Sequence, residues 1–355
     1  MKVRFQQIEL TKRYPLAISR GVSTGSVNLF VSVQAGGVTG IGEMCPGKLT
    51  GAETADEGQA ALEALLAGGI EGRSIHEVWQ LGRQRQVPPC ALAALDVALW
   101  DLKAKRAGLA LRELLALPAP TAATSITIGI NPPEVIRQRV PEMLARTAAK
   151  FLKVKLGSPE GLEADRASYA AAAESARPFG VGLRVDANGG WDLPGAKQML
   201  GWLAERGAEY VEQPLPMGRE DELGELFAHR PLPIFVDESC RFASDIPAWA
   251  DAVDGVNVKL MKCGGITEAV RVVAVARACG LGTMIGCMGE SSISISAGAS
   301  IGGLFDHVDL DSHLNLAPDC AEGCELIDGV VTAARRPGHG GRLKGAPAGK
   351  DAAEC

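Results

Sequence analysis

Four features are absent from this sequence, and each absence argues against a class of protein. No long run of Lys or Arg occurs, and 36 basic against 42 acidic residues give a net charge of −6, which disfavours nucleic acid or an anionic membrane as the main partner. The nine cysteines form no Cys-x-x-Cys pair, so we expect reduced thiols in a cytoplasmic protein. No stretch reaches the roughly 18 apolar residues of a membrane span. Residues 1–20 alternate like a strand and lack the apolar core of a secretory signal.

The composition that is present is that of an ordinary soluble globular protein, with 46% hydrophobic and 22% charged residues. Its 355 residues are enough for a closed α/β barrel and a smaller domain. Residues 1–120 predict an α+β domain, in which strands come first and helices follow. We expect a polar loop over residues 20–26 and the strongest helix over Cys90–Ala107, with a linker at Pro118-Ala-Pro120.

Beyond this linker, short β-rich runs alternate with Ala-rich helical stretches at steps of about 20 to 30 residues, a rhythm typical of a parallel sheet. We therefore expect a (β/α) barrel over residues 121–315. The segment 316–355 is rich in Gly, Pro and charge, and we expect it to return to the first domain and to fray beyond Lys344. The expected strands are Ser125–Ile130, Phe151–Leu156, Gly182–Asp186, Tyr210–Glu212, Ile234–Asp237, Gly255–Leu260, Gly282–Cys287 and Val308–Leu310.

Three acidic residues lie at the ends of consecutive expected strands: Asp186, Glu212 and Asp237. Each one alone has a plain explanation, because an acid after a strand often caps the next helix. Three together would repel one another unless a hard cation neutralised them, and a ligand set made only of oxygen suits Mg²⁺ better than zinc. The carboxyl ends of barrel strands are also where chemistry occurs in this fold. The pattern therefore predicts a magnesium site.

Lysines flank this acidic series on the strands before and after it. Lys153 and Lys155 are two apart on the second strand and so share a face, and Lys259 ends the sixth strand. Taken alone, the pair is also compatible with a solvated edge strand. Strands two and six face each other across a barrel, however, which would place a base on each side of a flat intermediate.

These motifs resemble the enolase superfamily, in its muconate lactonising subgroup, and most of all the dipeptide epimerases of the L-Ala-D/L-Glu epimerase type. Asp309-Leu-Asp311 matches the Asp-x-Asp motif that holds the substrate's ammonium group in that family. Gly286-Cys287-Met288 and Thr127 agree with it, and Arg20 aligns with an arginine that binds a glutamate side chain. The resemblance implies a modified (β/α)7β barrel with an α+β capping domain built from the N-terminal segment and the C-terminal tail.

The resemblance also implies a reaction. One Mg²⁺ per subunit would be held by the three acids, and Lys155 and Lys259 would exchange acid and base roles, with Lys153 tuning Lys155. A proton would leave the α-carbon of the C-terminal residue of an L-X-L-Y dipeptide, Ala-Glu being one candidate, and return through an enediolate. The small-molecule dipeptide would be the main partner, and the family's habit predicts a homo-oligomer.

Some alternatives stay open at this stage. The chain could be another enzyme of the same subgroup: an N-acylamino acid racemase, an o-succinylbenzoate synthase or a muconate cycloisomerase. It could also be a barrel without catalysis, although such a protein should have lost a ligand or a lysine. Asn188 and Gln213 either orient the acids or are satisfied loop amides. We expect Lys262 to be a helper or surface residue, and His313 to be structural.

Overall fold

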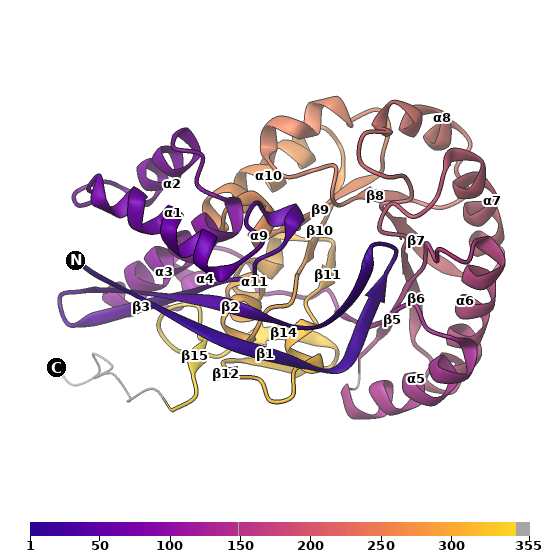
Figure 1. Cartoon of the computed structure of the whole chain (residues 1–355), viewed down its shortest axis with the longest axis horizontal. Helices are drawn as coiled ribbons and strands as arrows, with labels where there is room; N and C mark the ends of the chain where they lie inside the picture. Colours follow the sequence, from indigo (N-terminus) through magenta and orange to yellow (C-terminus); the bar gives the residue numbers. More distant parts are fainter. Residues whose placement is uncertain (148, 346–355) are drawn as a thin grey trace.

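The computed structural model describes residues 1–147 and 149–345. It consists of an N-terminal cap, drawn in indigo and violet in Figure 1, packed beside a barrel ringed by helices. The expected fraying beyond Lys344 concerns residues 346–355, which lie outside the described residues.

The cap is a three-stranded antiparallel sheet with helices on one face. Helix α3 (Pro89–Ala107) packs closely on β3 (Val38–Met44). The backbones are so near that a Cβ atom at Gly42 would come within 2.1 Å of the Ala94 carbonyl oxygen. This close approach explains the glycine at that position. The cap elements are β1 (Lys2–Ile18), β2 (Gly21–Ala35), β3 (Val38–Met44), α1 (Ala55–Ala67), α2 (Ile75–Gln84), α3 (Pro89–Ala107) and α4 (Leu111–Leu114).

The prediction of a loop over residues 20–26 is wrong, because β1 and β2 form one long hairpin that turns at Ser19 and Arg20. The pairing slips between Thr11 and Leu16, and such a bulge bends a hairpin. Beyond the bend the hairpin runs toward the barrel (Figure 1), where the Ala17 carbonyl accepts a hydrogen bond from the Ile130 amide. The polar residues of this stretch belong to strands that lie over the barrel.

The barrel has eight parallel strands in sequential order, which confirms the expected fold class. Ladder pairing joins each strand to the next, while β4 and β11 lie side by side. The strands are β4 (Ser125–Ile128), β5 (Phe151–Lys155), β6 (Gly182–Asp186), β7 (Ala208–Glu212), β8 (Ile234–Val236), β9 (Gly255–Lys259), β10 (Gly282–Gly286) and β11 (His307–Asp309). The helices are α5 (Pro133–Thr147), α6 (Leu162–Ala176), α7 (Leu193–Ala204), α8 (Leu223–Ala228), α9 (Leu260–Cys263), α10 (Ile266–Ala278) and α11 (Ser292–Ile301).

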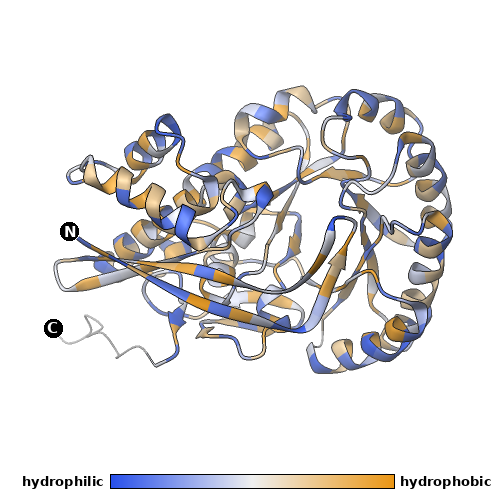
Figure 2. Ribbon diagram, viewed as in Figure 1, coloured by the Kyte–Doolittle hydropathy of each residue, from blue (hydrophilic) through white to orange (hydrophobic). Residues whose placement is uncertain are grey.

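The barrel strands are buried on both faces, by the barrel interior on one side and the helices on the other. The outer faces of the surrounding helices are largely hydrophilic (Figure 2). Most charged residues within these strands are therefore buried and need a partner, Glu209 on β7 being an exposed exception.

The C-terminal segment contacts the cap, as expected. The Gly338 carbonyl accepts a hydrogen bond from the Leu111 amide, and the His339 ring lies 2.8 Å from the Ile41 carbonyl oxygen. The division of the chain at residues 120 and 315 stays a prediction. The segment forms β12 (Ala321–Glu322), β13 (Cys324–Ile327), β14 (Val330–Ala333) and β15 (Arg342–Leu343).

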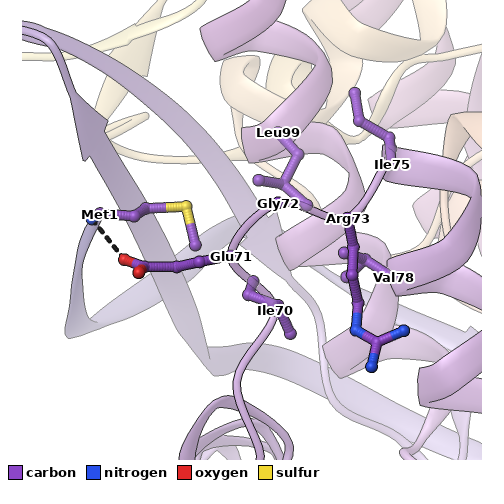
Figure 3. A pocket seen from close by; sticks show the side chains of 8 residues that line it. All are labelled: Met1, Ile70, Glu71, Gly72, Arg73, Ile75, Val78 and Leu99. Atoms are coloured by element: carbon purple, nitrogen blue, oxygen red, sulfur yellow. Dashed lines mark hydrogen bonds and ion pairs between the residues drawn. The ribbon is translucent and has the colours of Figure 1, made fainter.

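A surface cleft of about 350 Å³ lies in the cap, away from the barrel (Figure 3). It is bordered by Met1, whose ammonium group pairs with Glu71 at 2.7 Å, and by Ile70, Val78 and Leu99. None of the predicted site residues lines it. Within the described part of the chain, no helix combines the length and apolarity that crossing a membrane requires.

Candidate active site

The predicted metal ligands meet at the carboxyl end of the barrel. Asp186 and Glu212 are the last residues of β6 and β7, and Asp237 follows β8 directly. Each offers one carboxylate oxygen, and these oxygens lie within 4.8 Å of one another. All three residues are buried, with at most 1% of each exposed. Three converging oxygen donors suit a hard divalent cation.

The electrostatics of this cluster also fit a cation. Burial, and then repulsion from Asp186, raise the pKa of Glu212 to about 7. Glu212 Oε2 is buried and makes no hydrogen bond, although the Lys153 ammonium lies 2.6 Å from it. A carboxylate held among other carboxylates is stabilised by added positive charge.

Two lysines of β5 face the acids, as their spacing predicts. Lys153 Nζ lies 2.6 Å from Glu212, 2.5 Å from Asp309 and 3.4 Å from Asp186. Burial opposes its charge, but Asp309 and Glu212 outweigh burial and raise the pKa of Lys153. Lys155 Nζ lies 2.5 Å from Asp186 Oδ2. Lys153 is thus held by acids on three other strands, while Lys155 contacts one metal-ligand candidate.

Lys259 reaches the same cluster from β9, the fourth strand around from β5, and its Nζ lies 2.8 Å from Asp237 Oδ2. Of the two alternatives expected for Lys262, a helper or a surface residue, the surface position is wrong, and so is the expectation that the next turn moves the side chain off the barrel face. Lys262 is 1% exposed, and its Nζ lies 2.5 Å from Asp237 Oδ1. It also donates to the carbonyls of Asp237, Cys240 and Asn257. The one-turn helix α9 begins at once after β9 and leaves this side chain inside.

Two amide side chains lie next to the acids. Asn188 donates through its backbone N and its Nδ2 to the two oxygens of Asp186, at 2.8 and 3.2 Å. Gln213 Oε1 accepts from the Asp237 amide at 2.8 Å. Asn188 thus contacts the Asp186 carboxylate, whereas Gln213 contacts the backbone of Asp237 and also donates to Leu215 and Ser239. A role for both residues in orienting the acids stays a prediction. Asn188 and Gln213 have positive φ values of 46° and 39°, which cost energy in residues with a Cβ atom.

Asn257 and Glu238 are two site residues that sequence reasoning missed. Asn257 Nδ2 donates to Glu212 Oε1 at 2.6 Å, and Glu238 is buried beside Asn188. Both had a usable signal. Asn257 precedes Lys259 by two residues on β9, so it shares a face with that lysine, and Glu238 directly follows Asp237.

The Asp-x-Asp pair lies beside the metal-ligand candidates. Asp309 accepts from Ser125 Oγ at 2.6 Å, and Asp311 Oδ2 accepts from the Thr127 amide at 2.7 Å. Burial opposes the charge of Asp309, but Lys153 outweighs burial and lowers its pKa to about 2. Burial, and then Asp309, raise the pKa of Asp311 to about 6. A cationic group that binds here would therefore meet one carboxyl group that is strongly acidic, Asp309, and one that holds its proton more tightly, Asp311.

The remaining predicted substrate residues lie around this pair and at the barrel mouth. Cys287 Sγ lies 3.3 Å from the Asp309 carbonyl oxygen, and the Met288 amide donates to Glu290 at 2.8 Å. Arg20 lies at the turn of the β1–β2 hairpin, where its Nη2 pairs with Glu238 at 2.5 Å. A role for these residues in binding substrate stays a prediction.

Comparison with known families agrees with this geometry. Residues 1–116 match the N-terminal domain model of mandelate racemase and muconate lactonizing enzyme, and residues 135–346 match the model described as enolase C-terminal domain-like. The chain belongs to the enolase superfamily.

Within the enolase superfamily, the chain is similar to several dipeptide epimerases. A hydrophobic dipeptide epimerase of Roseobacter litoralis is 60% identical over 97% of this chain and 99% of its own length. One of Flavobacteria bacterium (strain MS024-2A) is 56% identical over 97% and 99%. The dipeptide epimerase of Enterococcus faecalis V583, crystallised with Mg and the dipeptide L-Leu-L-Tyr, has a TM-score of 0.88 at 29% identity, covering 96% of this chain and 98% of that one.

Proposed function

We propose that this protein is a magnesium-dependent dipeptide epimerase that inverts the α-carbon of the C-terminal residue of an L-X-L-Y dipeptide. The observation that carries the proposal is the placement of Lys155 and Lys259 on opposite strands, with the three-carboxylate cluster between them. An inversion requires that a proton leave one face of the α-carbon and arrive at the other. Two amines on opposite sides of one carboxylate cluster meet that requirement.

Asp186, Glu212 and Asp237 would hold the magnesium ion, since they form a buried set of oxygen donors. When bound there, Mg²⁺ supplies a Lewis acid for the substrate carboxylate and so makes the α-proton more acidic. Lys262, Asn188 and Gln213 keep Asp237 and Asp186 in place through the contacts described above. The chain thus provides both the donors and their support.

The lysines carry the proton in this proposal. The neutral amine of Lys155 or Lys259 accepts the α-proton from its own face, and the ammonium of the opposite lysine then donates one to the other face. Lys153 differs from both, because three carboxylates hold it as an ammonium ion. A permanently charged Lys153 stabilises the negative charge that develops on the substrate.

Asp309 and Asp311 would bind the free ammonium group of the dipeptide's first residue. Asp309 is held by Lys153 and Ser125, while Asp311 Oδ1 accepts a long contact from Cys287 Sγ, at 3.8 Å. A cationic ligand would therefore restore full charge to Asp311. The alternative functions in the same subgroup need no such pair, since their substrates carry no ammonium group at that position.

Uncharged, hydrophobic side chains are the substrate class that we favour over Ala-Glu. The relatives from Roseobacter litoralis and Flavobacteria bacterium, 60% and 56% identical, are both named hydrophobic dipeptide epimerases. In addition, Arg20, the expected partner of a glutamate side chain, is already paired with Glu238. An arginine that is engaged within the protein offers less to an acidic substrate.

The decisive experiment follows deuterium from D₂O into the α-position of L-Leu-L-Tyr and of its epimer L-Leu-D-Tyr, in the presence of Mg²⁺. Lys155→Ala and Lys259→Ala should each abolish epimerisation while retaining exchange on one epimer only, and the two variants should retain opposite epimers. Removal of the metal with EDTA should stop exchange in the wild type, and added Mg²⁺ should restore it. Loss of exchange on the same epimer in both variants would contradict the two-lysine assignment.

A further inference from the structure

The turn of the β1–β2 hairpin is fastened to the barrel by one arginine. Arg20 Nη1 donates to the Asn188 carbonyl at 2.5 Å, and Arg20 Nη2 pairs with Glu238 Oε1 at 2.5 Å. Ser19 Oγ donates to the same Asn188 carbonyl at 2.9 Å. Two loops that follow different barrel strands, β6 and β8, are thus joined to the cap at a single point.

Glu238 is not a surface acid that happens to meet an arginine. Its side chain is only 2% exposed, whereas that of Arg20 is 39% exposed. Within the described residues, the hydrogen-bond partners of the Glu238 carboxylate are Arg20 and Asn188 Nδ2, the latter at 3.3 Å, and both approach Oε1. A buried carboxylate is costly without a cation. The guanidinium is therefore the group that stabilises Glu238 in its place.

Both barrel residues that contact Arg20 are in turn connected to metal-ligand candidates. Asn188, which accepts from Arg20, donates to both oxygens of Asp186. Glu238 directly follows Asp237 in the chain. Movement of the hairpin turn away from the barrel would therefore remove support from two of the three acids.

We propose that Arg20 and Glu238 form a latch that holds the hairpin turn over the barrel mouth and, by occupying the guanidinium, makes the site select against acidic side chains. Arg20 is then a positioning residue, and Glu238 determines specificity. The selectivity half of this statement rests on the proposed function. The latch itself rests only on the contacts of the free protein.

Amide hydrogen exchange of the free protein, followed by mass spectrometry, tests the latch without any substrate. Arg20→Gln and Glu238→Gln should each speed exchange in peptides covering residues 14–24 by about tenfold or more, while peptides from α3 stay unchanged. Glu174→Gln is the matched control, because it breaks an exposed arginine–glutamate pair, Arg137–Glu174, on the outside of the barrel. Exchange at the turn that is unchanged in both latch variants would overturn the proposal.

Selectivity is measured as the ratio of kcat/KM for L-Ala-L-Glu to that for L-Leu-L-Tyr. Glu238→Gln frees the guanidinium, so the ratio should rise by about tenfold, whereas Arg20→Gln should not raise it. The reversed pair Arg20→Glu/Glu238→Arg should recover slow exchange at the turn more than either single change does.

Because Arg20 lies at the rim, Arg20→Gln keeps the test valid even if Glu238→Gln fails to fold. A ratio unchanged in Glu238→Gln, with faster exchange at the turn, would overturn the selectivity half alone. Absence of epimerisation with normal exchange results would overturn the proposed function and leave the latch standing.

Discussion

At the scale of single residues, the site is a set of buried side chains of opposite charge. Four buried lysines contact the carboxylates of four buried acids, so no charge in the cluster is left without a partner. Removing one member of such a set leaves its partner charged and unpaired, which costs more than the pair itself contributes. The lysines are Lys153, Lys155, Lys259 and Lys262, and the acids are Asp186, Glu212, Asp237 and Asp309.

Lys262 is where this reasoning gives a first prediction. Lys262→Met should lower the free energy of unfolding by about 3 kcal/mol, because it takes the ammonium group away from Asp237 Oδ1 and from three backbone carbonyls, and leaves Lys259 as the lysine that still pairs with Asp237. It should also weaken Mg²⁺ binding by about tenfold, since outer contacts orient metal ligands. Urea unfolding and calorimetric titration with Mg²⁺ measure the two effects. Lys197→Met, which removes an exposed ion pair with Glu225, is the control and should change neither quantity.

Asp311 gives a second prediction at this scale. Asp311→Asn should lower kcat/KM for L-Leu-L-Tyr by about a hundredfold, because it removes a charge from the partner of the substrate ammonium. An N-succinyl amino acid lacks that ammonium, so any turnover of it should be unaffected. Parallel assays on both substrates provide the measurement. Equal losses on both would show that Asp311 acts through the fold of the site rather than through the ammonium.

The sequence predicts the acids and Lys155 and Lys259 well for a physical reason. Each ends or directly follows an apolar strand whose length and step of one βα unit are visible in the chain, and parallel strands bring such ends together. Lys262 could not be placed in this way, since a one-turn helix, α9, changes the period at the strand end. The partner of Arg20 could not be predicted either, because 218 residues separate it from Glu238.

At the scale of elements, the cap and the barrel are joined through the start of a helix. Glu43, at the end of β3, accepts hydrogen bonds from the backbone amides of Ser291 and Ser294 at the start of α11, at 2.9 and 3.2 Å. It also accepts from Ser291 Oγ and from Asn28 Nδ2, both at 2.8 Å. The free amides of a helix start favour a carboxylate, and here that carboxylate comes from the other domain.

Glu43→Gln is the third prediction. The side-chain NH₂ group of the introduced glutamine would face the N–H and O–H groups that donate to the Glu43 carboxylate, and two donors cannot form a hydrogen bond. The free energy of unfolding should therefore fall by about 2 kcal/mol. The loop carrying Met288 precedes α11, so KM for the dipeptide should rise as well. Urea unfolding and steady-state kinetics are the measurements. Glu57→Gln, on the exposed start of α1, is the control, and equal stability of the two variants would contradict this role for Glu43.

The order of elements could be predicted from the sequence far better than the cap hairpin could. Barrel strands are buried on both sides and read as apolar runs, whereas residues 12–27 of the β1–β2 hairpin are exposed or half-buried, and part of this stretch reads as a polar loop. These strands are fixed by pairing with each other and by contacts with Gly129 and Asn188 on the barrel. Such contacts leave no periodic pattern in a sequence.

At the scale of the whole molecule, a buried histidine in the C-terminal segment closes the cap. The Gly341 amide donates to His339 Nδ1 at 2.9 Å, so the proton of the neutral ring is on Nε2, which donates to the Ile41 carbonyl at 2.8 Å. The His339 amide donates to Asp101, which also pairs with Lys105 at 2.6 Å. The neutral ring thus forms hydrogen bonds with the Gly341 amide of the C-terminal segment and with the Ile41 carbonyl of the cap. Ile41 and His339 are 298 residues apart in the chain.

This arrangement makes the stability of the molecule depend on pH, and that dependence is the last prediction. Burial lowers the pKa of His339, and Asp101 opposes burial only in part, while Lys105 adds to it. The neutral ring is favoured in the folded state, so its contribution is complete above the unfolded pKa of about 6.5. That contribution is lost as the pH falls through the lowered folded pKa. A proton on Nδ1 would also displace the Gly341 hydrogen bond.

The wild type should therefore lose stability from about pH 6.5 downward, and His339→Asn, which has no titrating ring, should lose less over the same range. Urea unfolding at pH 5, 6, 7 and 8 measures the difference between the two proteins, so that groups titrating equally in both cancel. His339→Asn should be the less stable protein at pH 8, where the intact ring makes all of its hydrogen bonds, and the gap should narrow toward pH 5. Two stability curves that stay parallel would show that His339 is held by packing alone, and that its neutral form is not what joins the C-terminal segment to the cap.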